Sequence, residues 1–212
     1  MVAMRILIVD DHAVVRRGLK ETLGEAFPRA TFAEAKSAEE TLVHARRQDW
    51  DVVILDISMP GKSGLDILDD LHRLRPKLPV LLLSIHPEEQ YARRALKSGA
   101  AGYLTKDSVP EELKEAVRRV LGGGRYVSAA LAEKLAFDLR RGADTPIHEL
   151  LSGREFQVLR MIASGSTVKQ IADEISLSVK TVSTYRARIL EKMGMKTNAD
   201  LIRYAIQTRL VD

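Results

Sequence analysis

The feature that most constrains the fold is an alternation, over the first 124 residues, between short apolar runs and segments with helical spacing. The apolar runs are rich in β-branched residues, as is typical of strands buried on both faces. They cover Arg5–Val9, Thr31–Ala33, Val52–Leu55, Val80–Leu83 and Gly102–Leu104. The segments with helical spacing cover Ala13–Leu23, Ala38–Arg47, Gly64–Arg75, Glu88–Lys97 and Val109–Leu121. This order predicts an α/β fold, a doubly wound five-stranded parallel sheet with helices on both faces.

The rest of the chain has no strand pattern. GGGR at 122–125 ends the last helix of the first part, and Ser128–Arg141 has the spacing of a further amphipathic helix. A polar stretch follows to Glu149, and four helices are then expected at Gly153–Ala163, Val168–Glu174, Val179–Met193 and Ala199–Thr208. We therefore expect a first domain over 1–124, a helical linker over 125–147 and a second, all-α domain over 148–212.

Composition excludes several classes of protein. The chain has no Cys, which rules out disulfides and thiolate metal sites. Its longest apolar runs are far too short to cross a bilayer, and the apolar segment at the start is too short for a secretory signal. A cytoplasmic protein is the simplest interpretation.

Positive charge is concentrated near the C-terminus. Residues 1–124 contain 19 basic and 19 acidic residues, whereas residues 148–212 contain 10 basic and 7 acidic residues. Between Ser178 and Lys196 there are five basic residues and one acid. This excess suits nucleic acid, although a solvated basic helix face is the commoner explanation of such a pattern.

Polar side chains stand at the ends of four predicted strands. Asp10 and Asp11 follow the first run, Asp56 the third, Ser84 the fourth, and Lys106 comes shortly after the fifth. Because the carboxyl ends of parallel strands share one edge of the sheet, these groups are expected to converge there. Three carboxylates repel one another unless a cation neutralises them, and Mg²⁺ is the usual cation beside a phosphate.

This set suits phosphoryl transfer to a carboxylate. Asp56 is the natural nucleophile, since Asp10 and Asp11 are adjacent and suited to holding a metal. Lys106 would stabilise charge on the phosphoryl oxygens. Each acid taken alone is more often a helix cap or turn residue, but five such groups at the right strand ends favour a phosphate and metal site.

Four motifs in this part resemble the receiver domain of bacterial two-component response regulators: ILIVDDH, VVILDISMPGKSGLDIL, LLLSIH and GAAGYLTKD, over residues 4–122. The resemblance implies a flavodoxin-like sheet of order 2-1-3-4-5 and phosphorylation of Asp56 by a sensor histidine kinase. It also implies that Ser84 and Lys106 bind the phosphoryl group and that Tyr103 changes rotamer with Ser84. Without the resemblance, Tyr103 would be taken as ordinary core.

The same resemblance implies a site for Mg²⁺ (or Mn²⁺). The expected ligands are Asp10, Asp11, Asp56 and the backbone carbonyl of Ser58, with Asp10 acting largely through water. His86 lies two residues beyond Ser84, and Ser58 two beyond Asp56. Side chains at these two places tune phosphate lifetime in the family, but His86 is equally well explained as a surface residue.

The segment STVKQIADEISLSVKTVSTYRARILEKMGM predicts two helices joined by a tight turn, with Ser178 as N-cap of the second. One face of that second helix is apolar, and the other is small and polar with cations at its margins. Such a face suits the major groove of DNA. An ordinary small helical bundle is the alternative that the pattern leaves open.

LSGREFQVLRMIASG and IADEISLSVKTVSTYRARILEKMG resemble the LuxR-type helix-turn-helix of NarL/FixJ regulators, over about residues 148–208. Gly153 and Val168 depart from that pattern, which commonly has Pro and a polar residue there. The expected base readers are Lys180, Ser183, Thr184 and Ala187. Arg188 would contact either bases or backbone, and Thr181, Lys169 and Lys192 would contact phosphates. Glu191 is either a further base reader or a solvated charge.

We therefore predict a response regulator in which phosphorylation of Asp56 controls dimerisation and DNA binding to regulate transcription. Its expected partners are a sensor histidine kinase, double-stranded DNA, RNA polymerase and a second copy of the chain. It is expected not to be an enzyme, apart from its own Mg²⁺-dependent phosphotransfer to Asp56 and its autodephosphorylation. Two alternatives remain: a Mg²⁺-dependent phosphohydrolase, disfavoured by Ser58 where a second Asp is expected, and a receiver that acts without phosphate.

Overall fold

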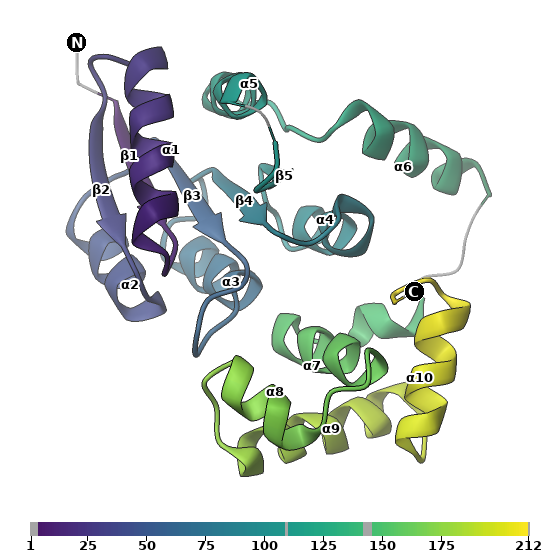
Figure 1. The fold of residues 1–212 in the computed structure, drawn as a ribbon. Helices are drawn as coiled ribbons and strands as arrows, with labels where there is room; N and C mark the ends of the chain where they lie inside the picture. The colour runs from purple at the N-terminus through teal and green to yellow at the C-terminus, as the bar shows by residue number, and fades with distance from the viewer. Residues whose placement is uncertain (1–3, 109, 142–145, 212) are drawn as a thin grey trace. The chain divides into compact units, whose positions relative to one another are not determined.

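The computed structural model describes residues 4–108, 110–141 and 146–211. Val109, expected in a helix, and residues 142–145, expected in the linker, lie outside them. The described chain forms two compact units, each treated by itself (Figure 1). The first contains β1 (Arg5–Val9), α1 (Ala13–Ala26), β2 (Thr31–Ala35), α2 (Ala38–Arg47), β3 (Val52–Asp56), α3 (Gly64–Leu74), β4 (Val80–Ser84), α4 (Glu88–Lys97), β5 (Gly102–Thr105), α5 (Pro110–Leu121) and α6 (Ala129–Arg141).

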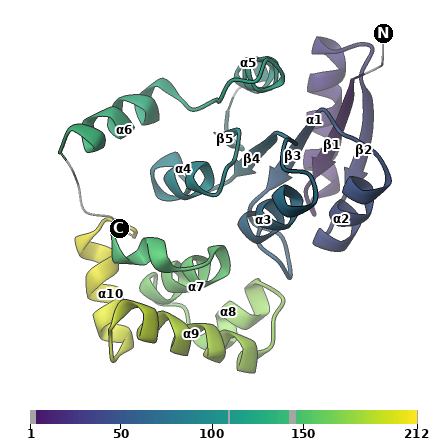
Figure 2. The ribbon, with the colours of Figure 1, turned by 180° about the vertical axis from the view of Figure 1, so that it is seen from behind.

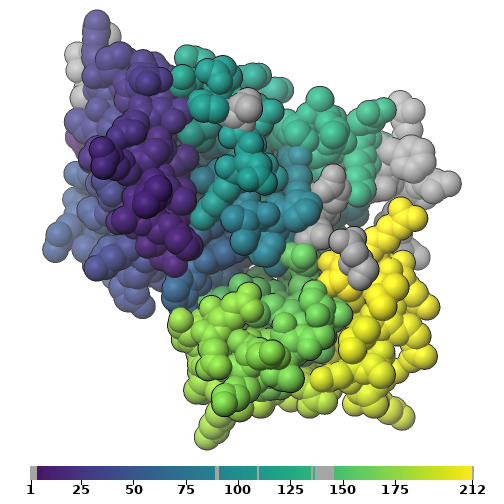
Figure 3. Space-filling model, in the orientation of Figure 1, coloured from purple at the N-terminus to yellow at the C-terminus, as the bar shows by residue number. Residues whose placement is uncertain are grey.

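The first unit is built on a five-stranded sheet of order β2-β1-β3-β4-β5, in which every pairing is parallel. The predicted order is confirmed. All residues of β3 and β4 are buried, because helices cover both faces of the sheet. Side chains from α1 and α5 pack on one face, and α2, α3 and α4 lie on the other (Figures 1 and 2). In Figure 3, α1 (purple) is on the visible surface of this unit.

The helices begin where the sequence supplies caps. Ser37 accepts a hydrogen bond from the amide of Glu40 at 3.3 Å and so caps the start of α2, a helix that the spacing predicts from Ala38. At the start of α6, the carboxylate of Glu88 in α4 accepts hydrogen bonds from the amide of Ser128, at 3.1 Å, and from the Ser128 hydroxyl. The Ser128 hydroxyl in turn accepts from the amide of Leu131 at 3.1 Å. α6 is therefore joined to α4 at its N-terminus.

The second unit contains the 3₁₀ helix η1 (Ile147–Leu150) and the helices α7 (Gly153–Ala163), α8 (Val168–Glu174), α9 (Val179–Met193) and α10 (Asn198–Gln207). Its core includes Leu159, Ile171, Val182, Ile189 and Leu201, all fully buried. The four α-helices agree with the expected ones within one residue at each end.

The caps of this unit explain its sharp helix boundaries. Ser178 accepts a hydrogen bond from the amide of Thr181 at 3.0 Å, which confirms it as the N-cap of α9. Gly194 ends α9 in the left-handed conformation, with φ of 64°. η1 was not predicted, because one short turn has no detectable periodicity. It is fixed by a contact distant in sequence: His148 Nδ1 lies 2.8 Å from the hydroxyl of Tyr204 in α10.

Among the described residues, no helix has the length and apolar character needed to cross a membrane.

Candidate functional site

The polar residues predicted to converge do lie together at the carboxyl edge of the sheet. Asp10 directly follows β1, Asp56 is the last residue of β3, and Ser84 is the last residue of β4. The register pairs Asp56 with Leu83, so the carboxylate lies level with the end of the neighbouring strand. Lys106 follows β5, and its amide donates to the carbonyl of Ser84 at 2.7 Å.

Lys106 is held between two buried carboxylates. Its Nζ lies 2.7 Å from Asp10 Oδ2 and 2.9 Å from Asp56 Oδ2. Both acidic side chains are 1% exposed, and the lysine side chain is 13% exposed. Such pairs are weakly screened by solvent, so their charges interact strongly.

The ionisation of this pair reflects burial and charge together. Burial raises the pKa of Asp56, and the negative charge of Asp10 adds to that effect, while Lys106 opposes it. Burial alone would lower the pKa of Lys106, but its hydrogen bonds and charge interactions with Asp10 and Asp56 outweigh burial and raise that pKa. The site therefore keeps Lys106 in its charged form. The single positive charge of Lys106 does not balance the negative charges of the neighbouring carboxylates.

The acids are arranged as a metal site would require. Asp10, Asp11, His12 and Asp56 each offer a ligand atom, and these atoms lie within 4.8 Å of one another. Asp11 Oδ1 is a buried oxygen that accepts no well-aligned hydrogen bond among the described residues, although His12 Nδ1 lies 3.0 Å away. Carboxylate oxygens are the ligands that Mg²⁺ prefers, so the residues present fit that ion.

His12 and Ser58 complete the surroundings of the acids. His12 was not predicted, although the motif DDH contains it; its Nδ1 lies 3.2 Å from Asp10 Oδ1 and 3.0 Å from Asp11 Oδ1. Ser58, expected to contribute its carbonyl, contacts Asp56 through its amide, which donates to Asp56 Oδ1 at 3.1 Å. The exposed imidazole ring of His12 therefore contacts both adjacent acids.

The two expected switch residues hold the same loop residue. Ser84 Oγ accepts a hydrogen bond from the amide of His86 at 3.0 Å, and the buried Tyr103 hydroxyl donates to the carbonyl of His86 at 2.9 Å. The ring of His86 stacks on Tyr91 in α4, with centroids 4.9 Å apart. The loop between β4 and α4 is thus tied to both residues.

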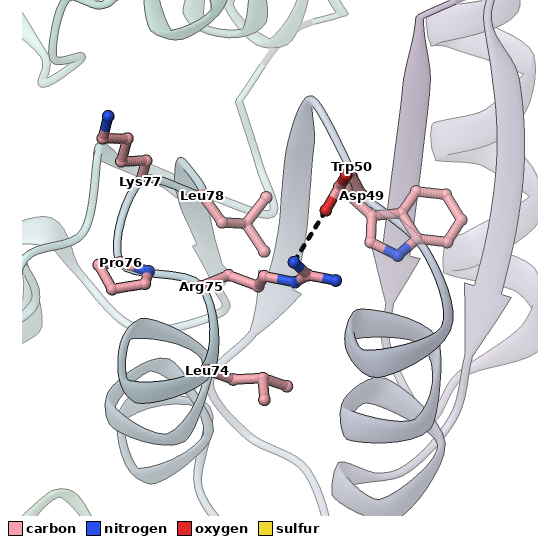
Figure 4. A pocket seen from close by; sticks show the side chains of 7 residues that line it. All are labelled: Asp49, Trp50, Leu74, Arg75, Pro76, Lys77 and Leu78. Carbon is pink, nitrogen blue, oxygen red and sulfur yellow. Dashed lines mark ion pairs between the residues drawn. The ribbon is translucent and has the colours of Figure 1, made fainter.

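A pocket of about 460 Å³ lies at the other, amino edge of the sheet (Figure 4). Arg75 and Asp49 form an ion pair of 3.0 Å across it. The lining residues precede β3 and β4 in the chain: Asp49, Trp50, Leu74, Arg75, Pro76, Lys77 and Leu78. The acid site and this pocket are at opposite ends of the strands.

In the second unit, α9 has one buried and one exposed face. Val182, Ile189 and Met193 are buried in the unit. Seven of the eight predicted DNA-contacting residues are exposed, and Thr181 is half-buried; the eight are Lys169, Lys180, Thr181, Ser183, Thr184, Ala187, Arg188 and Lys192. The predicted readers of α9 are therefore accessible to solvent, except for the half-buried Thr181, and Lys169 is exposed on α8.

One member of this set has a second partner. Lys192 Nζ lies 2.6 Å from Glu155 Oε2, which also accepts from the amide of Ser152 at 2.8 Å in the capping box of α7. Burial raises the pKa of Glu155, but Lys192 and Ser152 together outweigh burial and lower it. Sequence reasoning missed this ion pair, which joins residues 37 positions apart.

Both units match known families. Residues 6–118 match the response regulator receiver domain, and residues 149–205 match the bacterial regulatory proteins of the luxR family. The chain is a response regulator with a LuxR-type DNA-binding domain. It is 38% identical to response regulator GacA of Pseudomonas protegens over 99% of this chain and 98% of that protein. It is 32% identical to response regulator UvrY of Escherichia coli over 96% of this chain and 94% of that protein.

Solved structures agree with this assignment. A structure of the response regulator RcsB of Salmonella typhimurium has a TM-score of 0.67 and 25% identity, and the match covers 96% of this chain and 97% of that one. The RcsB–DNA complex has a TM-score of 0.59 and 25% identity, with 96% and 98% of the two chains covered. The receiver and the helix-turn-helix domain of this chain are therefore assigned from sequence and fold together.

Proposed function

We propose that Asp56 is the phosphoacceptor of this response regulator and that its phosphorylation by a sensor histidine kinase controls DNA binding. The observation that carries the proposal is the convergence of Asp10, Asp56 and Lys106, with Lys106 Nζ within 2.9 Å of both carboxylates. Asp56 carries the phosphoryl group as an acyl phosphate, and Lys106 and Ser84 bind its oxygens. Loss of the phosphoryl group by autodephosphorylation resets the protein.

A divalent cation, Mg²⁺ or Mn²⁺, belongs to the proposed site. Asp10, Asp11, Asp56 and the carbonyl of Ser58 are the residues that would hold it, and the cluster of ligand atoms within 4.8 Å supports this. When bound, the cation neutralises the carboxylates and polarises the phosphoryl group. Asp10 and Asp11 keep the acids together, and Lys106 balances part of their charge.

The proposed switch acts through the loop after β4. A phosphoryl group on Asp56 attracts the Ser84 hydroxyl, which in its present position accepts from the amide of His86. Displacing Ser84 loosens that loop and with it α4. Because Glu88 at the start of α4 caps α6 through Ser128, movement of α4 is passed to the helix that leads toward the second unit. The phosphate biases an existing equilibrium between two arrangements.

Domain limits of 1–124 for the receiver, 125–147 for the linker and 148–212 for the DNA-binding domain fit this division of labour. We further propose that two copies bind DNA together in the cytoplasm and that the bound protein regulates RNA polymerase. RcsB supports the dimer, since one solved structure contains two RcsB dimers bound to two parallel DNAs. Each copy then places α9 in the major groove of one half-site.

The test is phosphorylation of the full chain by a small phosphodonor with Mg²⁺, measured by intact mass and by a phosphate-affinity gel. Wild type is expected to gain one phosphoryl group and Asp56→Asn none. Asp107→Asn is the matched control, because Asp107 is an exposed acid one residue beyond Lys106. DNA binding, measured by fluorescence anisotropy, should rise on phosphorylation of wild type and of the control only. An unchanged mass of wild type, or labelling of Asp56→Asn, would refute the assignment.

A further inference from the structure

Arg16, near the start of α1, contacts two groups outside its own helix. Its Nη1 donates a hydrogen bond to the backbone carbonyl of Asp10 at 2.8 Å, and its Nε donates to Glu34 Oε2, in β2, at 3.1 Å. The arginine side chain is 14% exposed, so both contacts are partly shielded from water. The planar guanidinium therefore joins the residue that follows β1 to the neighbouring strand β2.

The carbonyl that Arg16 holds belongs to the peptide group between Asp10 and Asp11. A peptide group is planar, so a hydrogen bond to its oxygen restrains the whole group and the two α-carbons that it joins. The carboxylates of both residues belong to the cluster whose ligand atoms lie within 4.8 Å of one another. One hydrogen bond from Arg16 thus acts on the orientation of two proposed metal ligands at once.

Glu34 holds the guanidinium in place. It accepts from Arg16 through Oε2 and from Lys20 through Oε1, the latter at 3.4 Å. The hydrogen bond from Arg16 lowers the pKa of Glu34 more than desolvation raises it, and Lys20 lowers it further. Glu34 is therefore ionised at neutral pH and balances the charge of Arg16. This pairing suits Arg16 to orienting the acids of the site, and leaves their neutralisation to other groups.

We propose that Arg16 is a positioning residue of the metal site, which orients the Asp10–Asp11 peptide so that both carboxylates face one cation. The proposal rests on the proposed function, in which those acids hold Mg²⁺ or Mn²⁺. Removal of a residue that orients metal ligands commonly costs about 10- to 100-fold in metal affinity. Because Arg16 contacts the backbone of the ligands and not their carboxylates, we expect a loss of about tenfold, at the lower end of that range.

Two other roles of Arg16 predict different results. If Arg16 acted through its charge alone, its removal would take a positive charge away from a cation site, and metal affinity would rise. If Arg16 only joined α1 to β2, its removal would lower stability and leave the metal affinity of the folded protein unchanged. The positioning role predicts weaker metal binding by a protein that is still folded.

The test is a titration of the full chain with Mn²⁺ alone, in which electron paramagnetic resonance measures the free ion. Arg16→Met should bind Mn²⁺ about tenfold more weakly than wild type. Arg16→Lys keeps the charge but has one nitrogen in place of the two that make the contacts, so it should also bind more weakly. Urea unfolding followed by Trp50 fluorescence shows which variants are folded during the titration, and Arg16→Lys carries the test if Arg16→Met does not fold.

Arg17→Met is the matched control. Arg17 is the next residue of α1, its side chain is 83% exposed, and it pairs with Glu21 one turn along the same helix. Arg17→Met removes the same charge and the same kind of side chain, and it should bind Mn²⁺ as wild type does. Asp11→Asn removes a proposed ligand directly, and it should weaken Mn²⁺ binding.

The outcomes separate this inference from the proposed function. If Asp11→Asn weakens Mn²⁺ binding while Arg16→Met binds as wild type does or more tightly, the cation site stands and the positioning role alone fails. The positioning role also fails if Arg17→Met loses as much affinity as Arg16→Met, or if Arg16→Lys binds as wild type does. If wild type binds no Mn²⁺, or if Asp11→Asn binds it as tightly as wild type, the proposed cation site fails and this inference with it.

Discussion

Replacing Lys106 by the uncharged Met should destabilise the receiver strongly at neutral pH. At an effective dielectric constant of about 20, opposite unit charges 2.9 Å apart attract by about 6 kcal/mol, and Lys106 makes two such contacts. Desolvation of the ammonium offsets most of this gain, and removing one partner of a buried ion pair commonly costs about 3–5 kcal/mol. We expect a loss of about 3 kcal/mol, because the lysine is partly exposed and Asp56 can take up a proton instead.

Asp56→Asn should have the opposite effect and should stabilise the receiver at neutral pH. The pKa of Asp56 is raised in the folded state, so its contribution to stability is present below the unfolded value and is lost as pH rises through the raised value. At neutral pH the ionised carboxylate therefore costs stability, and the neutral amide removes that cost. The variant that combines Asp56→Asn with Lys106→Met should lose less stability than Lys106→Met alone. In the combined variant, Asp10 is left without its cation, but residue 56 no longer carries a charge.

The assay is urea unfolding of the full chain in buffer free of divalent cations. Trp50 is the single tryptophan of the sequence and is buried in the first unit, so its fluorescence reports unfolding of the receiver specifically. Chelation matters because a bound cation would replace the charge of Lys106. The charge argument is wrong if Lys106→Met has the same urea midpoint as wild type. It is also wrong if Asp56→Asn lowers the midpoint as much as Lys106→Met does.

Three further outcomes are expected. Gly102→Ala should destabilise the receiver by about 1–3 kcal/mol, read from the Trp50 midpoint, because the added Cβ would lie 2.6 Å from the carbonyl oxygen of Tyr126. The lowered pKa of Glu155 gives stability that is present above the unfolded value of 4.5 and lost as pH falls through the lowered value. The protection of amides 146–211 against hydrogen exchange, corrected for the intrinsic exchange rate at each pH, should therefore fall on acidification, and Glu155→Gln should flatten this dependence. Gly194→Ala should lower the free energy of opening of α9, measured by hydrogen exchange, by about 1 kcal/mol, which is the cost of a left-handed non-glycine residue. No side-chain clash adds to this cost, because the added Cβ has no atom within 4 Å.

Much of the receiver site was predictable because the carboxyl ends of parallel strands always lie at the same edge of a sheet. Short apolar runs identified the strands, so the residue after each run could be placed at that edge from the sequence alone. Asp10, Asp56 and Lys106 meet there for that reason, and Lys106 reaches both carboxylates. Helix ends were predictable where a cap accompanied a change of pattern, as at Ser37 and Ser178.

Contacts between side chains on different helices were not predictable. The Lys192–Glu155 ion pair depends on how α7 packs against α9, and helical periodicity defines faces without saying which faces meet. η1 depends on His148 reaching Tyr204 from 56 residues away. The donation of the Thr184 hydroxyl to its own helix is a choice between rotamers that composition does not determine.

Charge balance explains why this arrangement of residues can act as a switch. When ionised, Asp10, Asp11 and Asp56 carry three negative charges against the one positive charge of Lys106, a deficit that a divalent cation would cancel. Phosphorylation gives Asp56 about −1.5 to −2 charges in place of −1. The site would then be negative again and would attract a movable donor. In the proposed switch that donor is Ser84, whose hydroxyl accepts from the loop before α4, so a local excess of charge would be converted into a change at a helix.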